Sequence, residues 1–287
     1  FSNRFFFLIY MLFFFRASFC IFKINIFTMS LIIKLHPMQS SFQIILTAGK
    51  KVIKDILNLL QLDLTKNMAY DRQTRIIMQK VLSSDSNAID IGCHKGEVMK
   101  QILHYAPNGA HYGFEPIPNL FVKLKNTFKN KVTLFDYALS NQNGRSDFKF
   151  VTNAPAFSGI KERSYHISKP VIKTIQVELR KLDDVLPDDA RIDFIKIDVE
   201  GAEFDVMRGS EKLLRKNKPY IIFEFGLGAS EFYGSGPGEM YDFLSNKIGL
   251  NISLLKDFIS SGKTLEKSEL EHYYHSRTEY YFIAHAV

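Results

Sequence analysis

The sequence predicts an open α/β sheet of mostly parallel strands that finishes with an antiparallel pair. From residue 87 onward, apolar runs of strand length alternate with segments of helical periodicity, which is the pattern of parallel strands joined by crossover helices. The apolar and charged fractions, 46% and 23%, are those of a globular chain that buries a core. Two extended runs, 250–255 and 279–286, end the chain, and we expect them to pair as antiparallel strands at the sheet edge.

The alternation assigns each element in order. Two lead-in helices are expected first, at 49–65 and 69–82, because their apolar residues recur at helical spacing. The expected strands are 87–91, 110–115, 132–136, 192–198 and 219–225, and the expected helices among and after them are 96–105, 118–129, 201–216 and one near 238–247.

The alternation is interrupted in the middle of the chain. Asn143-Gly144 stands between two extended runs within 138–151, a pattern typical of a β-hairpin. Residues 172–186 add a further strand-like run. The stretch between them, 152–170, reads as a long loop, and loops of that length in compact domains are usually functional or disordered.

Three segments are expected along the chain: 1–48 outside the fold, 49–84 with the lead-in helices, and 85–287 as one α/β domain. The longest apolar stretch of the first segment, Phe5–Phe15, is eleven residues long, whereas a membrane-spanning helix needs about 20.

We interpret residues 1–28 as upstream sequence translated in error, with the start at Met29 or Met38. A signal peptide or a membrane anchor is the alternative. The expected location is therefore cytoplasmic, with membrane contact only if residues 1–28 belong to the protein.

The formal net charge of +7 is concentrated at the amino terminus. Seven basic residues precede the first acid, Asp55, so the 30 that follow balance 30 acidic residues. The neutral body gives no electrostatic reason to expect a nucleic-acid partner. The two cysteines, Cys20 and Cys93, are too few for a disulfide framework or a zinc cluster.

Five of the expected strands carry an acid at or near the carboxyl end. These acids are Asp90, Glu115, Asp136, Asp198 and Glu224. Ligands of open α/β sheets bind beyond the carboxyl ends of the strands, so we expect the acids to face one site.

The turn after the first strand, "AIDIGCHKGE" (88–97), indicates which ligand. Gly92 and Gly96 allow the backbone to approach a ligand and the helix to pack on the strand, and the free amides of that helix favour an anionic group. A dinucleotide fingerprint would read G-x-G-x-x-G, whereas here Asp90 would repel a pyrophosphate and attract an amino cation. Glu115 is placed to accept from both ribose hydroxyls. Asp136 is placed to accept from an adenine amine.

Ile117 or Tyr137 is expected against the adenine ring. A ligand that combines ribose, adenine, an amino cation and a carboxylate is S-adenosylmethionine, which is therefore the expected cofactor.

Four stretches resemble the FkbM family of S-adenosylmethionine-dependent methyltransferases: "AIDIGCHKGE", "HYGFEPIP", "FDYALSNQNG" and above all "IDFIKIDVEGAEFDVMRG". The resemblance covers roughly residues 70–285. It implies the class I methyltransferase fold, a Rossmann-like sheet of seven strands with the last antiparallel, and O-methylation of sugars, glycans or secondary metabolites. With the reading of the turn, it assigns cofactor binding to Asp90, Gly92, His94, Gly96, Glu115, Pro116, Asp136, Tyr137 and Ala138.

A hydroxyl acceptor gains from a general base, and the candidates for catalysis are Asp198, Glu200 and His166. Glu203, Lys196 and Glu224 lie at the same edge, although acids near a helix start also stabilise it through the dipole, and Lys196 has the alternative of pairing with an acid. A magnesium ion held by neighbouring carboxylates is an alternative that we do not favour, so no metal is expected. Tyr233, Gly234 and the loop 152–170 are expected to shape the acceptor site.

Two other functions compete with methyl transfer. One is a nucleotide-binding oxidoreductase of Rossmann type, and the other is a non-catalytic binding protein that keeps the fold. The expected partner is a small-molecule or glycan acceptor, and the sequence leaves the identity of the acceptor and the oligomeric state open.

Overall fold

The structure is a computed structural model, and it describes residues 65–165, 167–234 and 236–286. The expected segment 1–48, nearly all of the first lead-in helix and His166 lie outside the described residues. The second lead-in helix is present as α3 (Lys66–Val81), which begins with Thr65 capping the backbone N–H of Met68.

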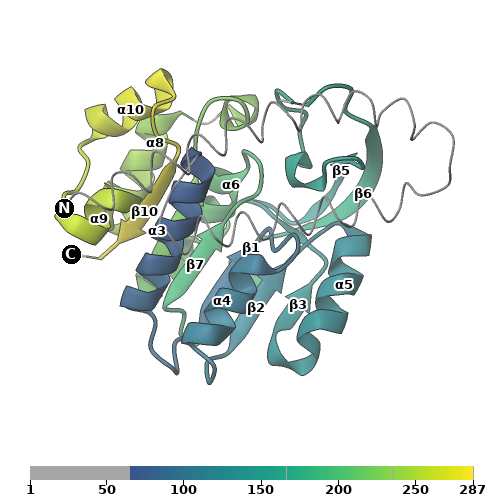
Figure 1. Ribbon diagram of the computed structural model, residues 1–287, viewed down its shortest axis with the longest axis horizontal. Helices are drawn as coiled ribbons and strands as arrows, with labels where there is room; N and C mark the ends of the chain where they lie inside the picture. Colours follow the sequence, from purple (N-terminus) through teal and green to yellow (C-terminus); the bar gives the residue numbers. More distant parts are fainter. Residues whose placement is uncertain (1–64, 166, 235, 287) are drawn as a thin grey trace, which may run out of the picture. The chain divides into compact units, whose positions relative to one another are not determined.

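A seven-stranded sheet forms the centre of the domain, with the order β3-β2-β1-β7-β8-β10-β9 (Figure 1). The strands are β1 (Ala88–Ile91), β2 (His111–Phe114), β3 (Thr133–Phe135), β7 (Phe194–Ile197), β8 (Tyr220–Glu224), β9 (Asn251–Leu254) and β10 (Tyr281–His285). β10 runs antiparallel to both of its neighbours, and the pairs from β3 to β8 are parallel. The predicted α/β class and its antiparallel end are confirmed.

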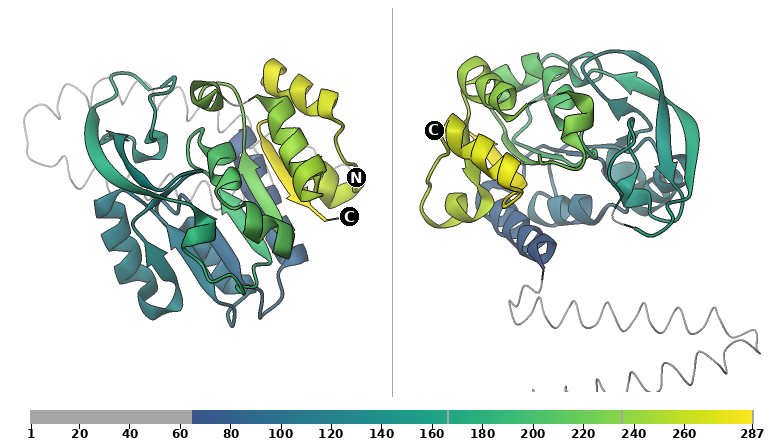
Figure 2. Two further views of the ribbon diagram at one scale, coloured as in Figure 1. Left: turned by 180° about the vertical axis from the view of Figure 1, so that it is seen from behind. Right: turned by 90° about the horizontal axis from the view of Figure 1, so that it is seen from above.

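Helices cover both faces of this sheet, as Figures 1 and 2 show from opposite sides. The first face packs against α3, α4 (Glu97–Tyr105), α5 (Pro118–Phe128) and α9 (Leu255–Ser260). The second packs against α6 (Glu203–Arg208), α7 (Glu211–Asn217), α8 (Pro237–Tyr241), the following π-helical turn (Asp242–Ile248) and α10 (Lys267–Ser276). Because both faces are covered, β1 and β7 are buried at every residue, including the charged Asp90 and Lys196 within them.

The single helix expected at 201–216 is wrong: α6 ends at Arg208 and α7 begins at Glu211. The backbone of Gly209 packs against the carbonyl of Ser140, where an added Cβ would lie 2.0 Å from the oxygen. Ser210 turns its hydroxyl back to the carbonyl of Val206, at 2.7 Å. Tertiary packing at this junction overrides the helical pattern. The sequence also gave no sign of α9 and α10.

The hairpin expected at 138–151 is also wrong. β4 (Ala138–Leu139) and β5 (Gly144–Val151) do not pair with each other, because β6 (Ile172–Arg180) lies between them in a second sheet of order β4-β6-β5. The side chain of Asn143 explains the difference: it accepts from the backbone N–H of Lys181 at 2.8 Å and donates to Asp184 at 2.7 Å. Asn143 therefore anchors the turn to the end of β6 and does not fold it back on β4.

Candidate active site

A cavity of about 670 Å³ lies where β1, β2, β7 and β8 end. Its walls come from the loops after these strands, from the β5–β6 connection with its 3₁₀ turn (Pro155–Phe157), and from residues 277–281. Figure 1 shows β5 and β6 at the end of the main sheet nearest β3 and α5. The site therefore lies at the edge that the acids indicated.

The turn after β1 approaches its neighbours too closely for any residue but glycine. Gly92 has φ +86°, and an added Cβ would lie 1.9 Å from the carbonyl oxygen of Asp198 on the next strand. Gly96 has φ +74°, and its Cβ would meet the Phe128 ring at 2.6 Å. Gly92 lines the cavity, whereas Gly96 seats α4 against α5.

Asp90 lies at the base of this turn and is 2% exposed. Its Oδ2 atom has no hydrogen-bond partner among the described residues. Burial raises the pKa of this carboxyl to about 6, although Lys196 acts in the opposite direction. An unpartnered buried oxygen of this kind is stabilised by a cationic hydrogen-bond donor.

Glu115 holds the loops after β1 and β2 together. The backbone N–H of His94 donates to Oε2 at 2.8 Å, and that of Ile117 donates to Oε1 at 2.9 Å. Burial raises the pKa of Glu115 to about 7. The residue lines the cavity, and each oxygen keeps a lone pair for a further donor.

Asp90 lies outside the lining of the cavity, whereas His94, Pro116, Tyr137 and Ala138 line it, as expected of cofactor contacts. Asp136 does not: its side chain is exposed and lies outside the lining. Phe135 and Tyr137 stack at 5.6 Å, so the extended chain turns the residue between them to the opposite side.

On the other half of the cavity, Asp198 is fixed by two side chains. Lys196 donates to Oδ2 at 3.1 Å, and the hydroxyl of Tyr281 donates to the same oxygen at 2.7 Å. The Lys196 ammonium also lies 4.8 Å from the centre of the Tyr281 ring. Burial would raise the pKa of Asp198, but Lys196 and the Tyr281 hydroxyl outweigh it and lower the pKa.

The two glutamates that follow have different surroundings. Glu200, with φ +59°, lines the cavity and forms an ion pair with Arg163 of the β5–β6 connection. Glu203 lies outside the lining and accepts from the backbone N–H groups of Val199 and Gly201, both at 3.1 Å. Burial raises the pKa of Glu203 to about 7. Glu203 thus organises the turn before α6.

The β5–β6 connection contributes Pro155, Phe157, Ile160 and Arg163 to the cavity. Tyr233 lies outside the lining, but its hydroxyl accepts from the backbone N–H of Lys161 at 3.1 Å and so supports this connection.

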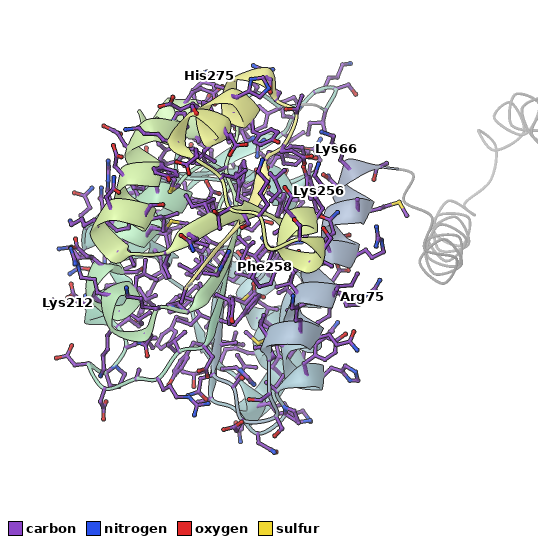
Figure 3. The ribbon with its side chains drawn as sticks, turned by 90° about the vertical axis from the view of Figure 1, so that its left-hand side faces the viewer. Lys66, Arg75, Lys212, Lys256, Phe258 and His275 are labelled. Carbon is purple, nitrogen blue, oxygen red and sulfur yellow. The ribbon has the colours of Figure 1, made fainter. Side chains whose placement is uncertain are left out.

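The segment 277–281 forms the wall opposite the β1 turn and is tied to two helices. Lys66 of α3 donates to the carbonyl of Thr278, and Lys256 of α9 pairs with Glu279 at 2.8 Å. Figure 3 shows Lys66 and Lys256 on neighbouring helices of this side. Sequence reasoning missed the contribution of this wall and of Arg163, because neither belongs to a motif.

Among the described residues, no cluster of three or more histidine, cysteine, aspartate or glutamate side chains has the geometry to hold a metal ion. No helix of the described part is both long enough and apolar enough to span a bilayer.

Comparison with known proteins gives a family match, a curated relative and similar solved structures. Residues 90–249 match the model of the methyltransferase FkbM domain. The 2-O-methyltransferase NoeI of Sinorhizobium fredii is 30% identical over 176 residues, which cover 56% of this chain and 70% of NoeI.

Two solved structures are also similar. The methyltransferase FkbM of Methylobacillus flagellatus KT has a TM-score of 0.44 at 16% identity, over 71% of this chain and 44% of that one. A SAM dependent methyltransferase of Aquifex aeolicus has a TM-score of 0.38 at 11% identity, over 74% and 88%. This chain therefore spans less than half the length of the M. flagellatus protein.

The family match covers more than half of the chain and includes the strand ends that carry Asp90, Glu115, Asp198 and Glu224. The sheet, with β10 antiparallel near its edge, has the class I methyltransferase fold that the sequence predicted. The chain belongs to the FkbM family of S-adenosylmethionine-dependent methyltransferases.

Proposed function

We propose that this protein transfers a methyl group from S-adenosylmethionine to a hydroxyl oxygen of a sugar, a glycan or a secondary metabolite. The observation that carries the proposal is a single cavity lined by acids on two halves: Glu115 toward β2, and Asp198 and Glu224 toward β7 and β8. The buried Asp90 of β1 adjoins Glu115 on the first half without lining the cavity. The first half suits a cationic nucleoside, and we call it the nucleoside half. The second suits a neutral acceptor that donates hydrogen bonds, and we call it the acceptor half.

The residues of the first half fit S-adenosylmethionine. The unpartnered oxygen of Asp90 suits the amino cation, Glu115 suits the ribose hydroxyls, and the absence of a side chain at Gly92 leaves the backbone open to the ligand. The buried Nε2 atom of His94 also has no partner among the described residues. We assign cofactor contact to these four residues and to the lining residues Pro116, Ile117, Tyr137 and Ala138. When bound, the cofactor supplies a methyl group that its sulfonium already activates.

The remaining task of the chain is alignment, which is worth about 7–11 kcal/mol in well-oriented systems. Asp198, held by Lys196 and Tyr281, places a fixed negative charge on the second half. Glu200 and Arg163 position the β5–β6 connection over the acceptor. His166, outside the described residues, belongs to the same connection and stays a candidate for acceptor contact.

The charge of the cavity and the curated relative support the proposed acceptor class. Five acids line the cavity, Glu115, Asp198, Glu200, Glu224 and Glu279, against the cationic side chains Arg163 and Arg277. This balance opposes phosphorylated acceptors and nucleic acids and is compatible with neutral polyols. NoeI is a 2-O-methyltransferase, which supports a hydroxyl oxygen as the acceptor atom.

Calorimetric titration of the full chain with S-adenosylmethionine and with NAD tests the proposal. We expect the protein to bind S-adenosylmethionine and not NAD. The affinity for S-adenosylmethionine should be at least tenfold weaker in Glu115→Ala, because a hydrogen bond to a charged group contributes about 1.5–3 kcal/mol. Transfer of a radiolabelled methyl group to methyl glycosides of neutral hexoses and pentoses completes the test. Binding of NAD alone would overturn the proposal, and transfer to RNA but to no glycoside would change the acceptor class.

A further inference from the structure

Glu224, at the end of β8, is the acid of the second half of the cavity whose carboxyl group has no fixed partner. Asp198 is held by Lys196 and Tyr281, and Glu200 by Arg163. Glu224 lines the same cavity, yet its carboxyl group forms no hydrogen bond or ion pair with any described residue. A side chain without a partner here is available to a ligand.

The position of Glu224 places it on the acceptor half. β8 pairs with β7 on the side away from β1 and β2, and Glu224 lies in register with Tyr281 of β10. Glu115, the residue assigned to the ribose, follows β2, and both β1 and β7 lie between β2 and β8 in the sheet. The carboxyl group therefore lies beyond Asp198 as seen from the nucleoside half.

We infer that Glu224 is the general base that receives the proton of the acceptor hydroxyl, a role that rests on the proposed function. The acceptor oxygen forms its bond to the methyl carbon as the carbon–sulfur bond breaks, with the electron pair of that bond remaining on sulfur. The hydroxyl proton moves to a carboxylate oxygen of Glu224, which later releases it to solvent. Asp198 contributes a fixed charge and does not exchange a proton, because both of its donors stabilise the ionised form.

The groups around Glu224 set the pH at which it can act. Asp198, directly after β7, and Glu203 at the start of α6 repel its negative charge, and Lys196 and Arg163 attract it. Tyr280, directly before β10, and Tyr281 of β10 also interact with it: burial raises the pKa of both hydroxyls, and the charge of Glu224 adds to the shift. Burial, followed by Asp198 and Glu203, raises the pKa of Glu224 to about 8. The carboxylate form is therefore the minor one at pH 7 and becomes the major one above pH 8.

Glu224→Gln in the full-length protein tests the assignment, because it keeps the shape and removes the base. We expect kcat for methyl transfer to the glycosides to fall on the order of 10²–10⁴-fold. The affinity for S-adenosylmethionine should stay within about twofold, since Glu224 makes no contact on the nucleoside half. Glu266→Gln, the same change at an exposed residue at the start of α10 and outside the cavity lining, is the matched control and should match the wild type.

Two pH measurements separate a base from a residue that only supports the fold. In the wild type, kcat should rise with pH and level off near the pKa of Glu224, and this limb should be absent in Glu224→Gln. Infrared spectroscopy of the cofactor-free protein should show a protonated carboxyl group that titrates near pH 8 and is missing in the variant. Neither readout responds to a purely structural role.

The outcomes distinguish the inference from the function on which it rests. A Glu224→Gln protein that transfers methyl groups at the wild-type rate and pH profile overturns the assignment and leaves the proposed function intact. A carboxyl band that titrates near pH 4 also overturns it. If the wild type binds S-adenosylmethionine but methylates no hydroxyl probe, the proposed function fails, and the role of Glu224 as a base fails with it.

Discussion

The two halves of the cavity are held together in different ways. On the nucleoside half, side chains bind backbone: Glu115 accepts from two backbone N–H groups, and Gly92 fits against a carbonyl. On the acceptor half, side chains bind side chains, as in the Lys196–Asp198–Tyr281 and Arg163–Glu200 contacts. Backbone contacts repeat wherever the fold is kept, whereas side-chain contacts change with single substitutions. The difference suits one half to a constant cofactor and the other to a variable acceptor.

The largest expected effect is on the nucleoside half, at Gly92. Gly92→Ala places a Cβ 1.9 Å from the Asp198 carbonyl and forces alanine into the left-handed region. The strain alone costs about 1–2 kcal/mol, and the clash must also push the turn away from β7. We expect calorimetry to detect no binding of S-adenosylmethionine and urea unfolding to show a loss of more than about 2 kcal/mol.

Gly262→Ala separates the clash from the strain. Gly262 has φ +69° but no atom within 4 Å of its added Cβ, so the variant should lose only about 1 kcal/mol and keep its cofactor affinity. Equal losses of stability and cofactor affinity in the two variants would show that the close approach of Gly92 to Asp198 does not hold the nucleoside half in place.

The next largest effect is a loss of stability expected on the acceptor half. Lys196→Met removes the buried partner of Asp198, whose own side chain is 33% exposed. Breaking a buried pair costs 3–5 kcal/mol, and the partial exposure reduces the expected loss to about 2 kcal/mol at pH 7. Tyr281→Phe removes one hydrogen bond to the same oxygen and should cost about 1 kcal/mol.

The pH dependence of that loss has a definite sign. The native pKa of Asp198 is lowered, so its contribution is present above the unfolded value of about 3.9 and disappears as pH falls through the native value. Urea unfolding at pH 7 and pH 3 should therefore show a difference between wild type and Lys196→Met that shrinks in acid. A constant difference would mean that Lys196 acts through packing and not through charge.

The same contrast explains what the sequence made predictable. The β1 turn, the alternation of strands and helices and the edge of the sheet that holds the site follow from periodicity, from glycines at tight turns and from acids at strand ends. These signals reflect backbone geometry and are local in the chain. Asp136 shows the limit: its place after a strand was correct, but packing of Phe135 and Tyr137 turned it out of the cavity.

The side-chain contacts of the acceptor half, and the pairing of β4 with β6, could not be predicted in this way. Tyr281 reaches Asp198 across 83 residues, and Asn143 joins the end of β6 and not β4, so both contacts depend on tertiary structure. A tyrosine in a terminal strand and an Asn-Gly pair carry no local sign of these partners. His166 and the first lead-in helix stay predictions, since both lie outside the described residues, apart from Thr65 at the end of the helix.

A smaller effect concerns the protonation of the nucleoside half. The pKa of Asp90 is raised to about 6 and that of Glu115 to about 7, so both carboxylates ionise fully only above neutral pH. A cationic ligand prefers the ionised forms, so its affinity should rise roughly tenfold from pH 6 to pH 8. Calorimetry of the wild type and of Glu115→Gln measures this slope, which should be flatter in the variant. Affinity that falls with rising pH would contradict a cationic ligand on this half.

The smallest expected effect tests whether the acceptor half extends to α3, outside the family match. Asn67 lines the cavity, and its Oδ1 atom accepts from the Tyr280 hydroxyl at 2.5 Å. Because Asn67 is exposed, Asn67→Ala should lose a free energy at the low end of the range for one hydrogen bond. This loss corresponds to about a twofold rise in KM for the glycoside. The affinity for S-adenosylmethionine should not change, nor should either constant in Asn126→Ala on the surface of α5. A change in cofactor affinity without a change in KM would move this wall to the nucleoside half, and the division of the cavity would have to be redrawn.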